Sequence, residues 1–408
     1  MRSVVIVGGG QAGVQVADTL RSEGFDGAVA LVAEEPGDPY QRPQLSKEYL
    51  SDPGVPQPLA LRTLETLQAR GISVHAEIAA RALDLESRVV ELADGRTIVY
   101  DELVLATGSR NRELPVPGVD LAGVHALRTL PEALALRDAL PRARRLVVVG
   151  AGFIGLEIAS AARRHGADVT VLDVADRPMA RVLTPEMSAF FAHAHERDGV
   201  ALVLGEGVAG FEGDDHVRVV VGSSGARYEA DLVVVGVGAS AHARLAEDAG
   251  LLVADGIVTD ECLRASASGV WAAGDCARFE RQGSLLRLES VQNAVDQGKH
   301  VARSILAGPR PYRDVPWFWS HQCGVRLQIA GIIGEPDEVV IRGSRDEGRF
   351  SAFSFRRGEL LGVESVNSPA DHVSARRLLA GGATLTPAQA ADSDLDLKAL
   401  SRALQPSA

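Results

Sequence analysis

The sequence predicts an α/β fold with two similar parallel-sheet units, and two stretches carry this prediction. Residues 4–13 read VVIVGGGQAG, and residues 146–155 read LVVVGAGFIG. In both, an apolar, β-branched run comes directly before Gly-x-Gly-x-x-Gly, and apolar residues at helical spacing follow. A strand, a glycine loop and a helix in this order are typical of a Rossmann-like unit that binds a dinucleotide. We therefore expect two Rossmann-like units in one chain.

Each glycine of such a loop has its own task. The first permits a tight turn, the second lets backbone N–H groups approach a pyrophosphate, and the third lets the helix pack closely on the strand. The helix N-terminus then faces the anion. The candidate dinucleotide-binding residues are Gly8, Gly10, Ala12 and Gly13 in the first loop, and Gly150, Gly152, Ile154 and Gly155 in the second.

Both units continue into a second strand that ends in an acid. The run AVALVAE ends at Glu34, and the run DVTVLD ends at Asp173. A carboxylate about 20 residues after the loop can accept hydrogen bonds from a ribose diol. Asp173 suits a free 2′-hydroxyl and repels a 2′-phosphate, which favours NADH, although Arg177 could soften this preference. Two dinucleotide sites suggest a tightly but non-covalently bound flavin, FAD, and an exchangeable nicotinamide.

Three further stretches fit the same plan. Residues 100–108, YDELVLATG, predict a strand that ends in a glycine turn at Thr107 and Gly108. Residues 270–277, VWAAGDCA, predict another, and Asp275 there can bind the hydroxyls of a ribityl chain. The stretch ADLVVVGVG, which ends at Gly238, echoes the first strand and should close the second dinucleotide unit.

Composition excludes several other classes of protein. The net charge of −12 argues against nucleic-acid binding, which needs clustered Lys and Arg. The three cysteines form no C-x-x-C pair, and His193 and His195 would point to different faces of a helix, so we expect no metal site. The sequence shows no signal-peptide pattern and no apolar run of membrane-spanning length, so we expect a cytoplasmic protein that does not bind membranes.

At this point the sequence resembles the flavoproteins with two dinucleotide-binding folds. Within them it is most similar to ferredoxin reductases of the putidaredoxin reductase type, which supply electrons to haem monooxygenases and ring dioxygenases. The narrower resemblance rests on four segments and covers essentially the whole chain. They are RPQLSKEYL at 42–50, GAGFIGLEIA at 150–159, ESVQNA at 289–294 and PWFWSHQ at 316–322.

The resemblance implies a domain organisation. It implies an FAD-binding domain from residues 1–110 and 237–313, with an NAD-binding domain, 111–236, inserted within it. A C-terminal α+β domain, 314–408, follows, in which EVVIRG at 338–343 and RFSAFSF at 349–355 read as strands. An Ala-rich acidic tail ends the chain.

The resemblance also implies roles for particular residues. Lys47 and Glu157 would be catalytic, close to the reactive nitrogen of the flavin, with the carboxylate keeping the lysine charged and in place. Arg42 would contact an FAD phosphate or hold its loop. Val291 would offer a backbone hydrogen bond to the pyrimidine edge of the flavin. From the sequence alone, Lys47 and Glu157 are also consistent with ordinary surface charges.

Two of the three tryptophans, Trp317 and Trp319, lie two residues apart. The resemblance places Trp319 at the electron exit, between the flavin and the partner ferredoxin, with Trp317 on the alternating, inward side. Both could equally belong to a core strand. The family usually reads Trp-Ser-Asp-Gln-Tyr here, whereas this chain has His321 and Cys323, which leaves the identity of the ferredoxin open.

The sequence is therefore interpreted as an NADH:ferredoxin oxidoreductase whose partner is an iron–sulfur ferredoxin, expected to be of the 2Fe–2S type. Related flavoproteins that reduce peroxides, oxygen or a coenzyme A disulfide carry a redox cysteine near Lys47, and residues 40–47 contain none. Two alternatives stay open. One is a rubredoxin or nitrite-reductase-type reductase of the same fold, and the other is an NADH-binding redox signalling protein resembling apoptosis-inducing factor.

Overall fold

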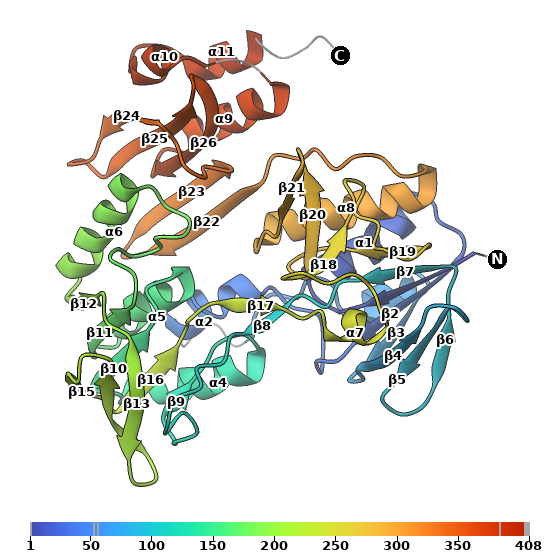
Figure 1. Cartoon of the computed structure of the whole chain (residues 1–408), viewed down its shortest axis with the longest axis horizontal. Helices are drawn as coiled ribbons and strands as arrows, with labels where there is room; N and C mark the ends of the chain where they lie inside the picture. Colours follow the sequence, from blue (N-terminus) through green and yellow to red (C-terminus); the bar gives the residue numbers. More distant parts are fainter. Residues whose placement is uncertain (1, 52–53, 55–56, 383–384, 404–408) are drawn as a thin grey trace. The chain divides into compact units, whose positions relative to one another are not determined.

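The computed structural model describes residues 2–51, 54, 57–382 and 385–403. The chain folds into two compact units, each assembled from segments that are separate in the sequence (Figure 1). The first unit contains residues 1–41, 58–110 and 239–314. The second contains residues 42–57, 111–238 and 315–408.

A five-stranded parallel sheet forms the centre of the first unit, in the order β19–β7–β1–β2–β3. Val4 in β1 pairs with Val29 on one side and Glu102 on the other. A parallel sheet is covered on both faces, which explains why its central strands read as continuous apolar runs. The strands are β1 (Ser3–Val7), β2 (Ala28–Ala33), β3 (Ile72–Ala76), β7 (Glu102–Leu105) and β19 (Val270–Ala272).

Helices α1 (Gln11–Ser22) and α8 (Val291–Ala307) pack against each other in this unit. A Cβ atom at Gly298 in α8 would lie 2.8 Å from the carbonyl oxygen of Ala12 in α1, so glycine permits this close packing. The remaining elements include α3 (Leu64–Ala69), α7 (Arg244–Asp248), β4 (Ala80–Asp84), β5 (Val89–Leu92), β6 (Thr97–Val99), β8 (Ser109–Asn111), β17 (Ala239–Ala241), β18 (Ile257–Thr259), β20 (Ala277–Arg281) and β21 (Ser284–Leu286).

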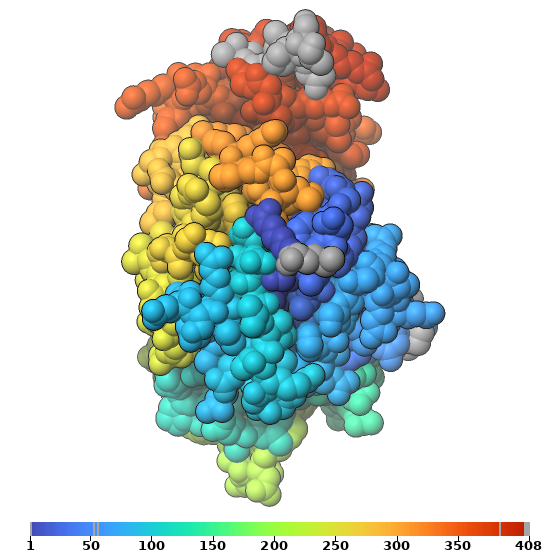
Figure 2. Space-filling model, turned by 90° about the vertical axis from the view of Figure 1, so that its right-hand side faces the viewer, coloured from blue at the N-terminus to red at the C-terminus, as the bar shows by residue number. Residues whose placement is uncertain are grey.

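The start of the chain is tied to segments far away in the sequence. The Arg2 guanidinium donates to the carbonyl oxygen of Ile305 at 2.8 Å and pairs with the Glu102 carboxylate at 2.5 Å. Figure 2 shows this arrangement, with the dark blue start of the chain between the cyan segment near residue 100 and the orange segment near residue 300. Arg2 thus joins the segments near residues 100 and 300 at the surface of the first unit.

The second unit contains a parallel sheet of the same design, in the order β12–β11–β10–β16–β9. The stretch before Gly238 forms β16 and pairs with β10, so the prediction that it closes this sheet is confirmed. The strands are β9 (Val124–His125), β10 (Arg145–Val149), β11 (Asp168–Asp173), β12 (Val200–Leu204) and β16 (Leu232–Val235). The other elements are η1 (Arg42–Gln44), α2 (Glu48–Ser51), α4 (Leu130–Ala139), η2 (Leu140–Arg142), α5 (Phe153–Arg164), α6 (Pro185–Arg197), β13 (Val208–Gly213), β14 (Val217–Gly222) and β15 (Arg227–Glu229).

The C-terminal part of the second unit is a five-stranded antiparallel sheet, in the order β22–β23–β26–β25–β24. The two strands predicted at 338–343 and 349–355 are both present. Within residues 385–403 of the acidic tail, Ala390 and Leu397 are buried in the core of this domain, so this part is folded. The elements are β22 (Trp317–Gln322), β23 (Val325–Gly331), β24 (Glu338–Ser344), β25 (Arg349–Arg356), β26 (Glu359–Val366), α9 (Pro369–Gly381), α10 (Pro387–Ala391) and α11 (Leu397–Ala403).

Residues 42–57 group with the second unit, whereas the sequence predicts them inside the FAD-binding domain, 1–110. Their contacts explain the difference. Helix α2 packs against α4 and α5, and Lys47 forms an ion pair with Glu157 in α5. Such contacts join residues more than a hundred positions apart, which a local sequence pattern does not reveal.

The longest helix of the described residues, α8, has 17 residues. Within residues 2–51, 54, 57–382 and 385–403, no helix combines the length and apolar character that crossing a membrane requires.

Candidate functional site

The first glycine loop joins β1 to α1 and is shaped by close backbone approaches. Gly8 has a φ of +120°, and a Cβ atom there would lie 2.1 Å from the carbonyl oxygen of Ala106. A Cβ atom at Gly13 would lie 1.9 Å from the carbonyl oxygen of Gly8. At Gly10, in contrast, a Cβ atom would meet nothing within 4 Å among the described residues. Packing therefore requires the outer glycines, and the middle one leaves open space at the N-terminus of α1.

The second loop, between β10 and α5, repeats this geometry. A Cβ atom at Gly150, whose φ is +110°, would lie 2.3 Å from the carbonyl oxygen of Gly236, and one at Gly155 would lie 2.2 Å from that of Gly150. The space at Gly152 is again open in the described part of the chain. Both helices begin without a side-chain cap, so their first N–H groups are available to an anion. The residues present fit a dinucleotide pyrophosphate at each loop.

The two acids follow their strands as predicted, but they differ in environment. Glu34 comes directly after β2 and is exposed. Asp173, the last residue of β11, accepts hydrogen bonds from the backbone N–H groups of Ala151, at 2.6 Å, and Ala175, at 2.8 Å. Asp173 is thus fixed beside the second glycine loop, where a carboxylate can meet a ribose. Ile154 is 44% exposed near the start of α5, and Gly238, with a φ of +106°, follows β16.

Arg177 is held by its own loop. Its guanidinium donates to the carbonyl oxygens of Leu183, at 2.7 Å, and Ala180, at 2.8 Å, and to the hydroxyl of Ser188, at 2.7 Å. The expectation that Arg177 could weaken the effect of Asp173 is therefore not supported, because its hydrogen bonds close the loop that precedes α6.

The first unit carries the other predicted flavin-site residues. The Thr107 hydroxyl donates to the carbonyl oxygen of His242 at 2.6 Å, and Gly108 has a φ of +72°. Asp275 accepts a hydrogen bond from the Ser109 hydroxyl at 2.9 Å. Val291 is the first residue of α8, directly after its N-cap, so its N–H has no partner within the helix.

A buried amide near these residues also suggests a ligand. Gln297 in α8 is fully buried, and its Oε1 accepts from the backbone N–H of Gly274 at 2.8 Å. Its Nε2 is buried and has no hydrogen-bond partner among the described residues. A buried donor of this kind is expected to find a partner, so this unit fits a bound polar group such as FAD.

Lys47 and Glu157 meet in the second unit. The Lys47 Nζ atom lies 2.7 Å from Glu157 Oε2, with the side chains 13% and 3% exposed. The Ser46 hydroxyl donates to the same carboxylate oxygen at 2.5 Å, and the Ser320 hydroxyl donates to Oε1 at 2.6 Å. Three donors therefore satisfy the buried carboxylate, and the ion pair holds the Lys47 ammonium in place.

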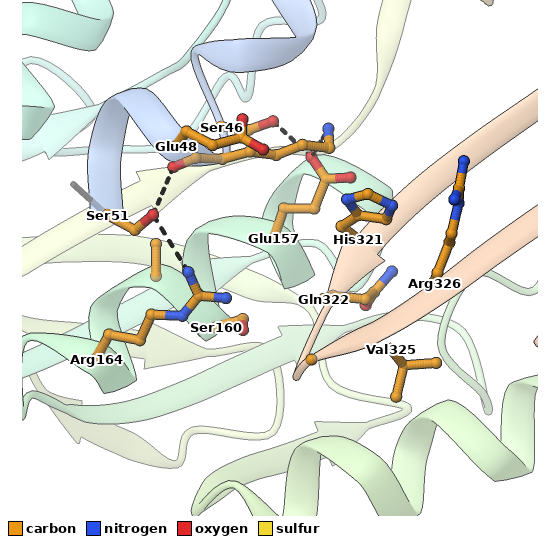
Figure 3. A pocket seen from close by; sticks show the side chains of 13 residues that line it. Ser46, Glu48, Ser51, Glu157, Ser160, Arg164, His321, Gln322, Val325 and Arg326 are labelled. Atoms are coloured by element: carbon orange, nitrogen blue, oxygen red, sulfur yellow. Dashed lines mark hydrogen bonds and ion pairs between the residues drawn. The ribbon is translucent and has the colours of Figure 1, made fainter. Parts of the chain in front are cut away.

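A pocket of about 330 Å³ lies beside this ion pair and contains further charged groups (Figure 3). Glu157 projects from α5 beside Ser46 and His321, and Arg164 donates to the Ser51 hydroxyl at 3.2 Å. Burial, and then the charges of Arg326 and Lys47, lower the pKa of His321. His321 is therefore neutral at pH 7.

Arg42, predicted to contact a phosphate or to hold its loop, donates from Nη1 to the carbonyl oxygen of Arg128 at 2.8 Å. This contact joins η1 to the segment before α4. The loop-holding interpretation agrees with it.

The prediction that Trp317 alternates in side with Trp319 is wrong, whereas its predicted inward position agrees with its packing against the core of the C-terminal domain. The two residues are separated by one position in β22, and side chains at i and i+2 of a strand share a face. Their ring centroids lie 5.7 Å apart, and both rings are partly buried. The Arg376 guanidinium lies over the ring of Trp317, 4.6 Å from its centroid. Trp317 therefore contacts both Trp319, whose ring is tilted by 39° to its own, and the Arg376 guanidinium.

The two histidines of α6 point in different directions, as predicted. His195 is fully buried, and its Nε2 lies 2.7 Å from Gln322 Oε1, whereas His193 is exposed. The Cys323 thiol lies 3.3 Å from His195 Nδ1. Among the described residues, no cluster of His, Cys, Asp and Glu could hold a metal ion.

Sequence reasoning missed the polar neighbours of Glu157. The serines of the two recognised segments, Ser46 and Ser320, both donate to this carboxylate. Their occurrence directly beside Lys47 and Trp319 was the available signal. Gln322 and His195 carried no comparable signal, because their contact depends on the fold.

Comparison with known proteins identifies the class of protein. Residues 2–298 match the family described as pyridine nucleotide-disulphide oxidoreductase, and residues 317–401 match the family described as reductase C-terminal. The chain belongs to the pyridine nucleotide-disulphide oxidoreductase family and carries the C-terminal reductase domain. It is an oxidoreductase of a family that binds a flavin and a pyridine nucleotide.

Individual relatives extend over nearly the whole chain. Rhodocoxin reductase of Rhodococcus erythropolis is 49% identical over 399 residues, which are 97% of this chain and 93% of the relative. The crystal structure of the ferredoxin reductase for the CYP199A2 system from Rhodopseudomonas palustris is 44% identical, with a TM-score of 0.96, and covers 98% of this chain and 100% of its own. The covalent putidaredoxin reductase–putidaredoxin complex is 38% identical, with a TM-score of 0.94 and 99% of both chains covered.

Proposed function

We propose that this protein is an FAD-dependent NADH:ferredoxin oxidoreductase that supplies electrons to a monooxygenase or a dioxygenase. One observation carries the proposal: Lys47 forms a largely buried ion pair with Glu157 of α5, and the segment around Lys47, residues 40–51, contains no cysteine. Without a redox-active cysteine in this segment, electrons must leave from the flavin itself. The names of the relatives, which include a rhodocoxin reductase and a putidaredoxin reductase solved with putidaredoxin, support an electron-carrier protein as the acceptor.

The two glycine loops support the assignment of the two dinucleotides. FAD would be held by residues 1–110 and 237–313, through the loop Gly8–Gly13 together with Glu34, Thr107, Asp275 and Val291, tightly but without a covalent bond. NADH would be held by residues 111–236, with residues 314–408 as the C-terminal domain. When bound, FAD supplies the step from two-electron to one-electron chemistry.

The ion pair has a positioning and electrostatic task. Glu157 holds the Lys47 ammonium at 2.7 Å, and the serine donors keep the carboxylate from turning away. A fixed cation near the place where negative charge develops stabilises that charge without reorganisation. We assign Lys47 and Glu157 to the reactive ring of the flavin on this basis.

The preference for NADH follows from Asp173. Its carboxylate is fixed by two backbone N–H groups beside the second loop, so a 2′-phosphate would meet a negative charge that cannot move away. Arg177 is engaged by Ala180, Leu183 and Ser188, which leaves it poorly placed to neutralise a phosphate.

Trp319 is proposed as the electron exit toward a 2Fe–2S ferredoxin. A partly exposed tryptophan is a favourable anchor for a protein partner. The Trp319 ring also packs against Trp317, with their ring centroids 5.7 Å apart.

The test is NADH-dependent reduction of cytochrome c by the purified flavoprotein, with and without a 2Fe–2S ferredoxin, repeated with NADPH. Strong stimulation by ferredoxin, with NADH much better than NADPH, is the expected result. A rapid flavin reduction by NADH without stimulation by any of several ferredoxins or a rubredoxin would contradict the proposed acceptor. Slow turnover with a change of oligomeric state on adding NADH would favour the signalling alternative.

A further inference from the structure

A chain of hydrogen bonds runs through the second unit from the Glu157 carboxylate to the Cys323 thiol. Ser320 Oγ lies 2.6 Å from Glu157 Oε1, and Gln322 Nε2 lies 3.1 Å from Ser320 Oγ. Gln322 Oε1 is 2.7 Å from His195 Nε2, and His195 Nδ1 is 3.3 Å from Cys323 Sγ. The three intermediate side chains are at most 1% exposed, so their hydrogen bonds are made within the protein.

The neighbours fix the direction of each hydrogen bond. An ionised carboxylate only accepts, so Ser320 donates to Glu157. The Gln322 NH₂ group faces two acceptors, Ser320 Oγ and, at 3.7 Å, Met179 Sδ, so its Oε1 faces His195. His195 then carries its proton on Nε2, which leaves Nδ1 as an acceptor 3.3 Å from the Cys323 thiol. Each donor along this hydrogen-bond chain thus points toward Glu157.

The protonation states at the far end agree with this direction. Burial raises the pKa of Cys323 to about 12, so the thiol keeps the proton it donates. Burial lowers the pKa of His195, so the ring is neutral at pH 7. Asp198, next to the end of α6, raises the pKa of both side chains. It is also a hydrogen-bond partner of the Cys323 thiol, so its carboxylate competes with His195 Nδ1 for the thiol proton.

The backbone holds Cys323 in place at one end of the hydrogen-bond chain. Cys323 has a φ of +50° in the two-residue turn between β22 and β23, a conformation that ordinary residues adopt at a cost. Its N–H donates to the Ser160 hydroxyl of α5 at 3.0 Å. Since α5 also carries Glu157, both ends of the hydrogen-bond chain are attached to the same helix.

We propose that Cys323, acting through His195, Gln322 and Ser320, sets the direction of this chain and thereby positions the Glu157 carboxylate for Lys47. These four are positioning residues. The structural part of the inference is independent of the function proposed above, whereas its kinetic consequence rests on that function.

The opposite direction shows why the thiol matters. Without a donor at Nδ1, His195 can carry its proton there and accept at Nε2 from a rotated Gln322 amide. The Gln322 oxygen would then draw the Ser320 hydroxyl proton away from Glu157. A buried carboxylate oxygen would lose its donor, which is costly and would let the carboxylate turn.

The first test measures the ring tautomer of His195 by ¹⁵N NMR in protein labelled at histidine. The signal is assigned by its loss in His195→Asn. We expect the Nε2–H tautomer in the wild type and in Cys323→Ser, and a shift toward Nδ1–H in Cys323→Ala. An Nδ1–H wild type, or an unchanged tautomer in Cys323→Ala, would overturn the proposal.

The second test measures flavin reduction by NADH in a single turnover. We expect Cys323→Ala to slow this step about fivefold, since a hydrogen bond contributes about 1 kcal/mol and about 1.4 kcal/mol corresponds to tenfold. Cys323→Ser should restore the rate to within about twofold. Cys262→Ala, which removes a buried thiol from the first unit, is the matched control and should not change it.

The proposal about the hydrogen-bond chain and the proposed function can be refuted separately. A changed tautomer in Cys323→Ala with an unchanged reduction rate would refute the positioning role of the chain. An absence of flavin reduction by NADH in the wild type would refute the proposed function, while the tautomer measurement would still decide the direction of the chain. The midpoint melting temperature of each variant identifies any loss of folding.

Discussion

Glu364, in the middle of the C-terminal sheet, accepts hydrogen bonds from both the backbone N–H and the hydroxyl of Thr184, at 2.9 and 2.5 Å. Thr184 is the N-cap of α6, so this pair connects β26 to a helix in the parallel-sheet part of the same unit. The Glu364 side chain is fully buried, and burial raises its pKa to about 7.

This pair predicts how stability depends on pH. Glu364 keeps its proton up to about pH 7 in the folded protein, but an unfolded glutamate loses it near its ordinary value of 4.5. Between these values the folded state binds more protons, so the free energy of unfolding falls as pH rises, by up to about 3 kcal/mol. Urea unfolding at several pH values measures this slope. Glu364→Gln should flatten it over this range, and equal slopes in both proteins would refute the assignment.

A second prediction concerns the ion pair. Glu157→Gln leaves the Lys47 ammonium without its partner and should lower the free energy of unfolding by about 3 kcal/mol. It should also slow flavin reduction by NADH about tenfold or more, since about 1.4 kcal/mol corresponds to each factor of ten. Denaturant unfolding and stopped-flow absorbance measure the two effects.

The double variant Lys47→Met, Glu157→Leu separates these effects. Replacing both charges with apolar groups of similar size should recover much of the lost stability. Flavin reduction should stay slow, because the positioned ammonium is missing. A double variant that reduces the flavin at the wild-type rate would remove the ion pair from the mechanism.

A third prediction concerns the choice of nicotinamide. Asp173→Asn removes the negative charge that a 2′-phosphate would meet, and should raise kcat/KM for NADPH relative to NADH about tenfold. Steady-state kinetics with both cofactors measures this ratio. Arg177→Met is the control, because Arg177 is engaged by its own loop and its loss should affect stability but not the ratio.

A fourth prediction distinguishes the two tryptophans. Trp319→Ala should reduce ferredoxin-dependent cytochrome c reduction about tenfold while leaving flavin reduction by NADH unchanged. Trp317→Ala should act first on stability, by about 2 kcal/mol, because Trp317 packs on the core of the C-terminal domain. An equal loss of both activities in Trp319→Ala would mean that this ring contributes to the flavin site as a whole rather than to the exit.

The sequence was sufficient for features that depend on local pattern. Gly8, Gly150 and their neighbours follow from strand, turn and helix signals within a few residues, and the acid at 173 follows from a fixed spacing. The hydrogen bond between Ser46 and Glu157 joins residues 111 positions apart, and that between His195 and Gln322 joins residues 127 apart. No local pattern encodes such pairs. The predicted alternation of Trp317 and Trp319 is wrong because side chains at i and i+2 of a strand share a face, whereas the inward position of Trp317 agrees with its packing on the core.

The interrupted course of the chain affects the order in which the protein can form during synthesis. All strands of the second parallel sheet lie between Val124 and Val235, so this sheet can be completed as soon as that stretch has left the ribosome. The first sheet begins with the earliest strand of the chain, Ser3–Val7, but needs Val270–Ala272 at its edge. The part of the protein that is started first is therefore finished later, and its open edge beside Glu102–Leu105 awaits a strand made about 165 residues afterwards.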